Sequence, residues 1–114
     1  HLALHLGAAG HAVVGIDRRN DRFPFNADVT DGRVIERALR LALPEVVVHL
    51  AAVVGRAFGE VEPAETIRQN ALGTVNVARA CAAVGARMVY ASTSEVYGDQ
   101  GLWVCREDGP MELP

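Results

Sequence analysis

The sequence predicts an α/β fold built on a parallel sheet. Short runs of Val, Ile and Ala that are apolar throughout, as buried parallel strands are, alternate with longer segments whose apolar residues recur at helical spacing. Aromatic residues make up only 5% of the chain, and the smaller side chains suit helices packed closely on a sheet. This alternation indicates strand–helix–strand crossovers, and therefore a doubly wound parallel sheet with helices on both faces.

The N-terminal part of the chain is expected to hold one short helix and two strands. The helix runs through residues 2–6, which are apolar apart from one histidine, and ends at Gly7 or Gly10. The first strand covers residues 12–16, a β-branched run. Residues 23–27 form a second, shorter strand, because an internal proline limits its length.

A second helix and another apolar strand follow. Thr30 or Asp31 can cap this helix, and Pro44 ends it. The strand covers residues 46–50. The inner face of the helix is expected to consist of Val34, Ile35, Ala38, Leu39 and Ala42.

The longest predicted helix begins at Pro63, after a loop that extends through Gly59. It runs to about Val84, where Gly85 ends it. Residues 87–91 form the third strong strand, and the remainder of the chain has no clear periodicity. The side chains expected to face inward along this helix are Ile67, Ala71, Val75, Ala78 and Ala82.

Charge and residue usage exclude several functions. Eleven arginines stand against 14 acidic residues, so the net charge is −3 and no broad basic face is available for nucleic acid. The chain has no lysine, which excludes a Schiff base or a Walker-type phosphate lysine within it. Cys81 and Cys105 match no metal or redox spacing, so we interpret them as core residues of a protein of the reducing cytoplasm. We expect no metal site, and no apolar run is long enough to span a membrane.

Polar residues stand where the ligand of a parallel sheet is expected, beyond the carboxyl ends of the strands. Asp17 follows the first strand, where a carboxylate can accept from both hydroxyls of an adenine ribose and repel a 2′-phosphate, which favours NAD over NADP. A solvated loop aspartate is the alternative. Arg18 and Arg19 can stack on adenine or attract a phosphate, so they leave the choice open.

Two other strand ends and one helical residue are further candidates. Asp28 can accept a hydrogen bond from the adenine amino group, or can serve as the acceptor of a turn. The small side chains after the next strand, at Leu50, Ala51 and Ala52, either allow a cofactor to approach closely or simply pack the strand end. Asn70 lies inside the long helix, where its amide requires a partner on a neighbouring loop or strand end.

The most distinctive segment is 91–99, which reads Ala-Ser-Thr-Ser-Glu-Val-Tyr-Gly-Asp. Three hydroxyls and a carboxylate follow the third strong strand directly, at the expected ligand site. A capped turn is the structural alternative, but four reactive side chains in succession favour a chemical role.

With these segments, the chain resembles the extended short-chain dehydrogenase/reductase family, the NAD-dependent epimerases and dehydratases that remodel nucleotide sugars. The resemblance implies a Rossmann-like doubly wound sheet, NAD as the cofactor and a nucleotide sugar as the substrate. The matching segments occur in the family's order and spacing at residues 14–17, 27–31, 49–52, 70–74 and 92–98.

The resemblance also implies roles for single residues. Asp17 is similar to the ribose-binding acid, with Arg18 beside it, and Asp28 to the adenine contact. Asn70 resembles the asparagine that braces the cofactor cleft. Thr93 matches the catalytic Ser/Thr that hydrogen-bonds the sugar hydroxyl to be oxidised. The other residues assigned to the cofactor in this way are Val29, Leu50, Ala51, Ala52 and Ser92.

Glu95 and Ser94 refine this hypothesis. Simple 4-epimerases usually have no acid at the position of Glu95, whereas nucleotide-sugar decarboxylases and 4,6-dehydratases do, because a 4-keto intermediate requires acid–base chemistry at a neighbouring carbon. Ser94 replaces the Asp of dTDP-glucose-type dehydratases, so the segment is more similar to UDP-glucuronate decarboxylases or GDP-mannose 4,6-dehydratases. A 4-epimerase and a non-catalytic Rossmann-like nucleotide-binding module are the alternatives.

Two motifs of the family fall outside the chain. Its Gly-rich phosphate loop is expected before His1, and its Tyr-x-x-x-Lys motif beyond Tyr97. We therefore interpret residues 1–114 as a partial NAD-binding domain, truncated at both ends and lacking the substrate-binding part. Alone, it is not expected to turn over substrate. For the full-length enzyme the resemblance implies a homodimer.

Overall fold

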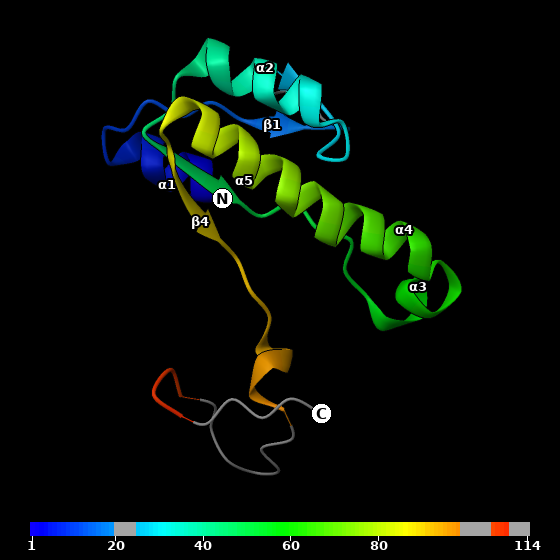
Figure 1. Cartoon of the computed structure of the whole chain (residues 1–114). Coiled ribbons are helices and arrows are strands. Elements are labelled where there is room, and N and C mark those ends of the chain that lie inside the picture. Colours follow the sequence, from blue (N-terminus) through cyan, green and yellow to red (C-terminus); the bar gives the residue numbers. More distant parts are fainter. Residues whose placement is uncertain (20–24, 99–105, 110–114) are drawn as a thin grey trace.

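The computed structural model describes residues 1–19, 25–98 and 106–109. Parallel strands alternate with helices, which confirms the predicted α/β class (Figure 1). The strands are β1 (Ile16–Asp17), β2 (Phe25–Asn26), β3 (Val46–His49) and β4 (Arg87–Tyr90). The helices are α1 (Leu2–Ala8), α2 (Gly32–Ala42), α3 (Arg56–Val61), α4 (Pro63–Ile67), the π-helical turn η1 (Arg68–Leu72), α5 (Gly73–Val84) and the 3₁₀ turn η2 (Ser94–Tyr97).

The strands pair in parallel, as predicted, and in the described residues they form two separate pairs. β1 lies beside β2, with Ile16 opposite Phe25. β3 lies beside β4 over four residues, from Val46 opposite Arg87 to His49 opposite Tyr90. Parallel strands require a crossover connection. The helical segment from α4 to α5 supplies it between β3 and β4, so both strands end at the same edge.

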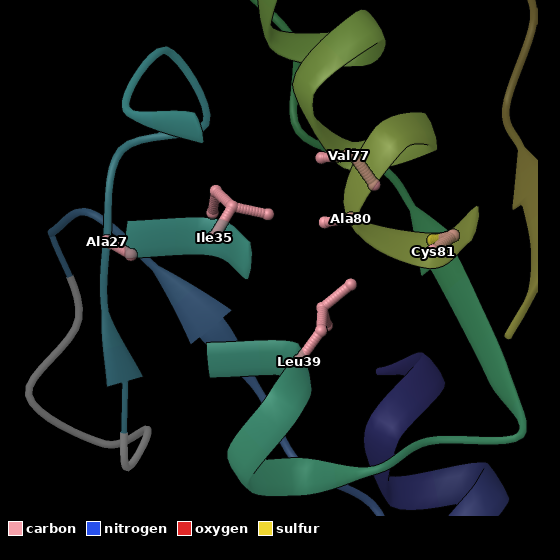
Figure 2. Close-up of a cluster of buried hydrophobic side chains, with 6 residues drawn as sticks. All are labelled: Ala27, Ile35, Leu39, Val77, Ala80 and Cys81. Carbon is pink, nitrogen blue, oxygen red and sulfur yellow. The ribbon is translucent and has the colours of Figure 1, made fainter. Parts of the chain in front are cut away.

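The core lies between α2 and α5, which pack against each other over both strand pairs (Figures 1 and 2). Burying a large aliphatic side chain such as Ile35 or Leu39 stabilises the fold by about 2 kcal/mol. Small residues on α5 let the two helices approach closely. The buried cluster consists of Ala27, Ile35, Leu39, Val77, Ala80 and Cys81.

Helix α2 closely follows the sequence prediction. The Asp31 side chain caps it by accepting hydrogen bonds from the backbone N–H groups of Arg33 and Val34. Three of the five predicted inward residues are buried: Ile35, Ala38 and Leu39. Ala42 is half-buried, and Val34 is the exception, with 40% of its surface exposed.

The long helix forms where predicted, but its inward face was predicted wrongly. Gly85 ends it at φ 73°, as expected. The expected inward residues Ile67 and Val75 are 66% and 47% exposed, and the buried residues are instead Gln69, Gly73, Val77, Ala80 and Cys81. Alanine and valine occur on almost every side of this helix, so hydrophobic periodicity alone could not identify the face that packs on α2.

Two other expectations were wrong in detail. The loop predicted through Gly59 contains the short helix α3. The first strand is limited to Ile16–Asp17, while Val13 and Val14, predicted within it, are 40% and 49% exposed. Val46 and other side chains of β3 and β4 are exposed, because α2 and α5 pack on the other face of these strands. A uniformly apolar strand does not reveal which elements will cover it.

Beyond β4, the chain leaves the α/β body and leads to η2 (Figure 1). Cys81 is a buried free thiol whose pKa is raised by burial, in agreement with the core role predicted for it; Cys105 lies outside the described residues. No helix in the described part of the chain combines the length and the apolar character needed to cross a membrane.

Candidate functional site

The polar residues around Asp28 form the densest hydrogen-bonded group in the described structure. Asp28 follows β2 and is partly buried. Its Oδ1 accepts from the backbone N–H and the hydroxyl of Thr30, at 2.9 and 2.8 Å. Its Oδ2 accepts from Arg18 and from Gln69, both at 3.3 Å. Burial alone would raise the pKa of Asp28, but these hydrogen bonds outweigh it and hold the pKa at about 2. Asp28 is therefore ionised at neutral pH.

Glu65 and Arg68 extend this group on the helical side. Glu65 accepts from Arg68 Nε at 2.8 Å and from Gln69 Nε2 at 2.9 Å. Arg68 also donates to the Thr30 hydroxyl at 3.0 Å, which ties the helix to the turn after β2. Arg68 and Gln69 keep the pKa of Glu65 below its usual range by hydrogen bonding to it. We call the set Arg18, Asp28, Thr30, Glu65, Arg68 and Gln69 the Asp28 cluster.

Asp17 lies at the end of β1, next to this cluster in sequence. Its Oδ1 accepts from the backbone N–H of Arg19 at 2.8 Å, which shapes the turn after the strand. The residue is exposed, so its carboxylate is open to solvent. Arg18 points its guanidinium to Asp28, 3.3 Å away, and lies 4.0 Å from Glu65. Two predicted site residues, Arg18 and Asp28, are thus in direct contact.

Val29 fixes the position of the helix beside β2. Its backbone carbonyl accepts from Asn76 Nδ2 at 3.0 Å, and its side chain packs on Gly73. A Cβ at position 73 would lie 2.6 Å from Val29 Cγ2, so only glycine fits without a shift. Val29 was predicted to bind the cofactor; within the chain, its contacts join β2 to α5.

Asn70 braces the loop after β3, the contact that its place inside a helix predicts. Its Oδ1 accepts from the backbone N–H of Val53 at 2.7 Å, and its Nδ2 donates to the carbonyl of the same residue at 2.9 Å. One side chain therefore satisfies both polar groups of a loop residue. The neighbouring Leu50, Ala51 and Ala52 stay exposed at the end of β3, open to a ligand.

His49 supports this brace from within the sheet. It is 4% exposed, and burial lowers its pKa, so the ring is neutral at neutral pH. The Thr74 hydroxyl donates its single proton to the backbone carbonyl of Asn70 at 2.6 Å, so it can only accept from His49 Nε2, at 3.1 Å. The contact therefore selects the tautomer with the proton on Nε2, and it links β3 to the helical turn that carries Asn70.

The predicted catalytic residues lie apart, beyond β4. Thr93 caps η2, and its Oγ1 accepts from the backbone N–H of Glu95 at 3.3 Å. Ser92, Thr93, Ser94 and Glu95 are all exposed. The segment leaves the α/β body in Figure 1, and the hydrogen bonds of Thr93 within the described residues are local. The structure thus groups Arg18 with Asp28 and braces the β3 loop, but it does not bring Thr93 or Glu95 to them.

Sequence reasoning missed the supporting residues Glu65, Arg68, Gln69, Thr74 and Asn76. Glu65 and Arg68 have the spacing of an ordinary helical ion pair, which by itself indicates only an exposed face. Gln69 and Asn76 offered the one available signal: an amide in the interior of a helix, which requires a partner. That argument was applied to Asn70 and applies equally to them.

A parallel α/β domain with its polar residues at the strand ends defines a nucleotide-binding class of protein. The sequence matches the family described as the NAD dependent epimerase/dehydratase family over residues 1–109. The chain belongs to this family.

Curated relatives include three different activities. The chain is 39% identical over 105 residues to a dTDP-4-dehydrorhamnose reductase of Streptomyces griseus, covering 92% of this chain and 33% of the relative. It is 30% identical over 118 aligned residues to a probable UDP-glucuronate 4-epimerase of Rhizobium meliloti, covering 86% and 35%. It is 39% identical over 72 residues to UDP-glucuronic acid decarboxylase 5 of Arabidopsis thaliana, covering 63% and 19%. The chain thus spans about a third of the first two relatives and less of the third.

Solved structures agree on the fold. The UDP-glucose 4-epimerase of Thermus thermophilus, in complex with NAD, superimposes with a TM-score of 0.85 at 28% identity, over 96% of this chain and 39% of that one. A dTDP-4-dehydrorhamnose reductase of Bacillus anthracis, in complex with NADP, gives a TM-score of 0.62 at 33% identity, over 65% of this chain and 27% of that one. These similarities confirm the predicted Rossmann-type architecture.

Proposed function

We propose that residues 1–114 are a partial NAD-binding Rossmann domain of a nucleotide-sugar enzyme that works through a 4-keto intermediate. Membership of the family and the likeness to an epimerase solved with NAD support the cofactor. The observation that carries the reaction type is Glu95, which lies two residues after Thr93 at the end of β4. A buried free thiol at Cys81 fits a reducing compartment such as the cytoplasm.

The residues at the ends of β1 and β3 fit the adenosine half of NAD. Asp17 offers an exposed carboxylate, which is the acceptor that two vicinal hydroxyls require. Ala51 and Ala52 are exposed and small, and Asn70 holds the loop that follows them. The Asp28 carboxylate already accepts four hydrogen bonds within the chain, so its main role is to shape this region and its predicted contact with adenine is a secondary one.

The catalytic proposal concerns protons at the sugar. Bound NAD supplies a hydride acceptor. The Thr93 hydroxyl would hydrogen-bond the C4 hydroxyl of the sugar and orient it. Glu95 would hold or exchange a proton at the neighbouring carbon once C4 is a ketone, which decarboxylation or 4,6-dehydration requires and simple 4-epimerisation does not. UDP-glucuronate decarboxylation and GDP-mannose-type 4,6-dehydration are the preferred activities, and 4-epimerisation is the alternative.

Glu95→Gln in the full-length enzyme tests the reaction type. Purified enzyme is incubated with UDP-glucuronate, GDP-mannose and UDP-glucose, and products are identified by mass spectrometry. If Glu95 moves a proton, overall turnover falls about a hundredfold or more while oxidised 4-keto sugar accumulates. A Glu95→Gln enzyme that retains full turnover and releases a C4 epimer would reject the proposed reaction and support the 4-epimerase. Glu107→Gln is the matched control, because it removes the same charge from another exposed residue that the structure describes.

A further inference from the structure

Selectivity between NAD and NADP depends on whether the arginine after Asp17 can bind a phosphate at the ribose. A 2′-phosphate is bound by an arginine near the ribose, whereas a free diol is bound by a carboxylate. This chain places both groups in succession, as Asp17 and Arg18. The family is described as NAD-dependent and the Thermus thermophilus epimerase was solved with NAD, but the Bacillus anthracis reductase was solved with NADP, so the preference varies among proteins similar to this chain.

The structure shows Arg18 engaged elsewhere. Its NH1 donates to Asp28 Oδ2 at 3.3 Å and lies 4.0 Å from Glu65 Oε1. The two carboxylates come from different elements, one after β2 and the other on α4. The Arg18 side chain is 38% exposed, so it could reach a bound anion if these carboxylates released it.

The charge balance of the Asp28 cluster also indicates that Arg18 is already engaged. The cluster contains two arginines and two carboxylates and is neutral while both acids are ionised. The low pKa of Asp28, about 2, and the lowered pKa of Glu65 keep them so at neutral pH. Asp17 beside it adds a negative charge. A 2′-phosphate would therefore meet the Asp17 carboxylate, while both arginines of the cluster are already paired.

We propose that Glu65 is a positioning residue for dinucleotide selectivity: together with Asp28 it holds Arg18 away from the ribose site, and so favours NAD over NADP. The proposal rests on the proposed function of this domain. Glu65 is the better of the two acids to test, because Asp28 also shapes the turn before α2 through Thr30. Glutamine at position 65 removes the charge and keeps the shape.

The experiment measures binding, independently of catalysis. The dissociation constants of 5′-AMP and adenosine 2′,5′-bisphosphate, which report the free ribose and the 2′-phosphate, are determined by titration calorimetry on the full-length enzyme. We expect Glu65→Gln to shift the affinity ratio toward the bisphosphate by about twofold to fivefold, the scale on which partly exposed ion pairs act. Glu65→Asp, which keeps the charge, should stay near the wild-type ratio.

Two further variants identify the responsible cation. Arg18→Met combined with Glu65→Gln should return the ratio to the wild-type value. Glu36→Gln, which removes a 2.7 Å ion pair with Arg40 on α2, should leave it unchanged. An unchanged ratio in folded Glu65→Gln overturns the proposal. A gain that survives Arg18→Met does the same, because Arg68 or Arg19 would then be the cation. If the wild-type enzyme binds neither nucleotide, the proposed NAD-binding function is itself wrong, and the proposal for Glu65 is overturned with it.

Discussion

The ends of β2 and β4 are both followed by polar residues that the sequence predicts to be functional, yet the two groups differ in how many hydrogen bonds hold them. At the end of β2, Asp28 is held by four hydrogen bonds from three residues of three segments. Beyond the end of β4, the Thr93 side chain accepts one local hydrogen bond among the described residues, and its polar neighbours are exposed. Residues of the first region support one another and the fold, whereas residues of the second are exposed to solvent. Substitutions in the two regions should therefore separate stability from activity.

The largest effect should come from Thr93→Val in the full-length enzyme. Losing the hydroxyl should slow sugar oxidation about a hundredfold. The free energy of unfolding should change by no more than about 1 kcal/mol, because only a local cap is lost. Single-turnover kinetics and urea unfolding measure the two quantities. Thr66→Val, which removes another local hydroxyl contact, to Glu62, is the control for the rate. An undiminished rate in Thr93→Val would remove Thr93 from the chemistry.

Gly73→Ala should have the opposite pattern to Thr93→Val, because it should lower the stability of the fold. The new Cβ would lie 2.6 Å from Val29 Cγ2, so β2 and α5 must separate slightly. We expect a loss of about 1–2 kcal/mol in unfolding free energy, even though alanine favours a helix. Gly59→Ala on α3, where the nearest atom is 3.9 Å away, should be neutral or slightly stabilising in the same urea titration. Equal effects of the two substitutions would contradict the close approach at Gly73.

Asn70→Ala should weaken both stability and nucleotide binding, because the β3 loop loses its brace. Two hydrogen bonds to Val53 disappear, and we expect a cost of about 1–2 kcal/mol. Asn70→Asp sharpens the test: it keeps the acceptor for the Val53 N–H but sets a carboxylate against the Val53 carbonyl. Its stability should therefore improve relative to wild type as the pH falls and the new acid becomes protonated. A pH-independent difference would show that the amide donor does not matter.

The smallest effect concerns acid stability. The pKa of Asp28 is lowered from 3.8 to about 2 in the folded chain, so its contribution is fully present above pH 4 and is lost as the pH falls toward 2. Allowing for access of water, we expect about 1 kcal/mol from this group. Urea unfolding between pH 5 and 2.5 should show a shallower decline for Asp28→Asn than for wild type. If the stabilities of Asp28→Asn and the wild type fell in parallel with pH, the pKa of Asp28 would not be lowered as its hydrogen bonds indicate.

The sequence by itself determined the order of the main elements, without α3 and η2, and the approximate positions of the strand ends. Uniformly apolar runs placed β3 and β4, the Asp31 cap and the apolar stripe placed α2, and Gly85 marked the end of the long helix. These signals are local, because a strand, a cap or a left-handed glycine is decided within a few residues. The sequence also indicated that the Asn70 amide needs a hydrogen-bond partner, although it did not identify that partner.

Only the tertiary structure decided which faces pack and which polar side chains meet. The long helix is apolar on almost every side, so the contact with α2, made through Val77, Ala80 and Cys81, could not be derived from periodicity. Glu65 lies 47 residues from Arg18 in sequence, and no local pattern reports that the two approach to 4.0 Å. Such contacts are set by the crossover that brings the helix over β2, and so by the packing of the whole domain.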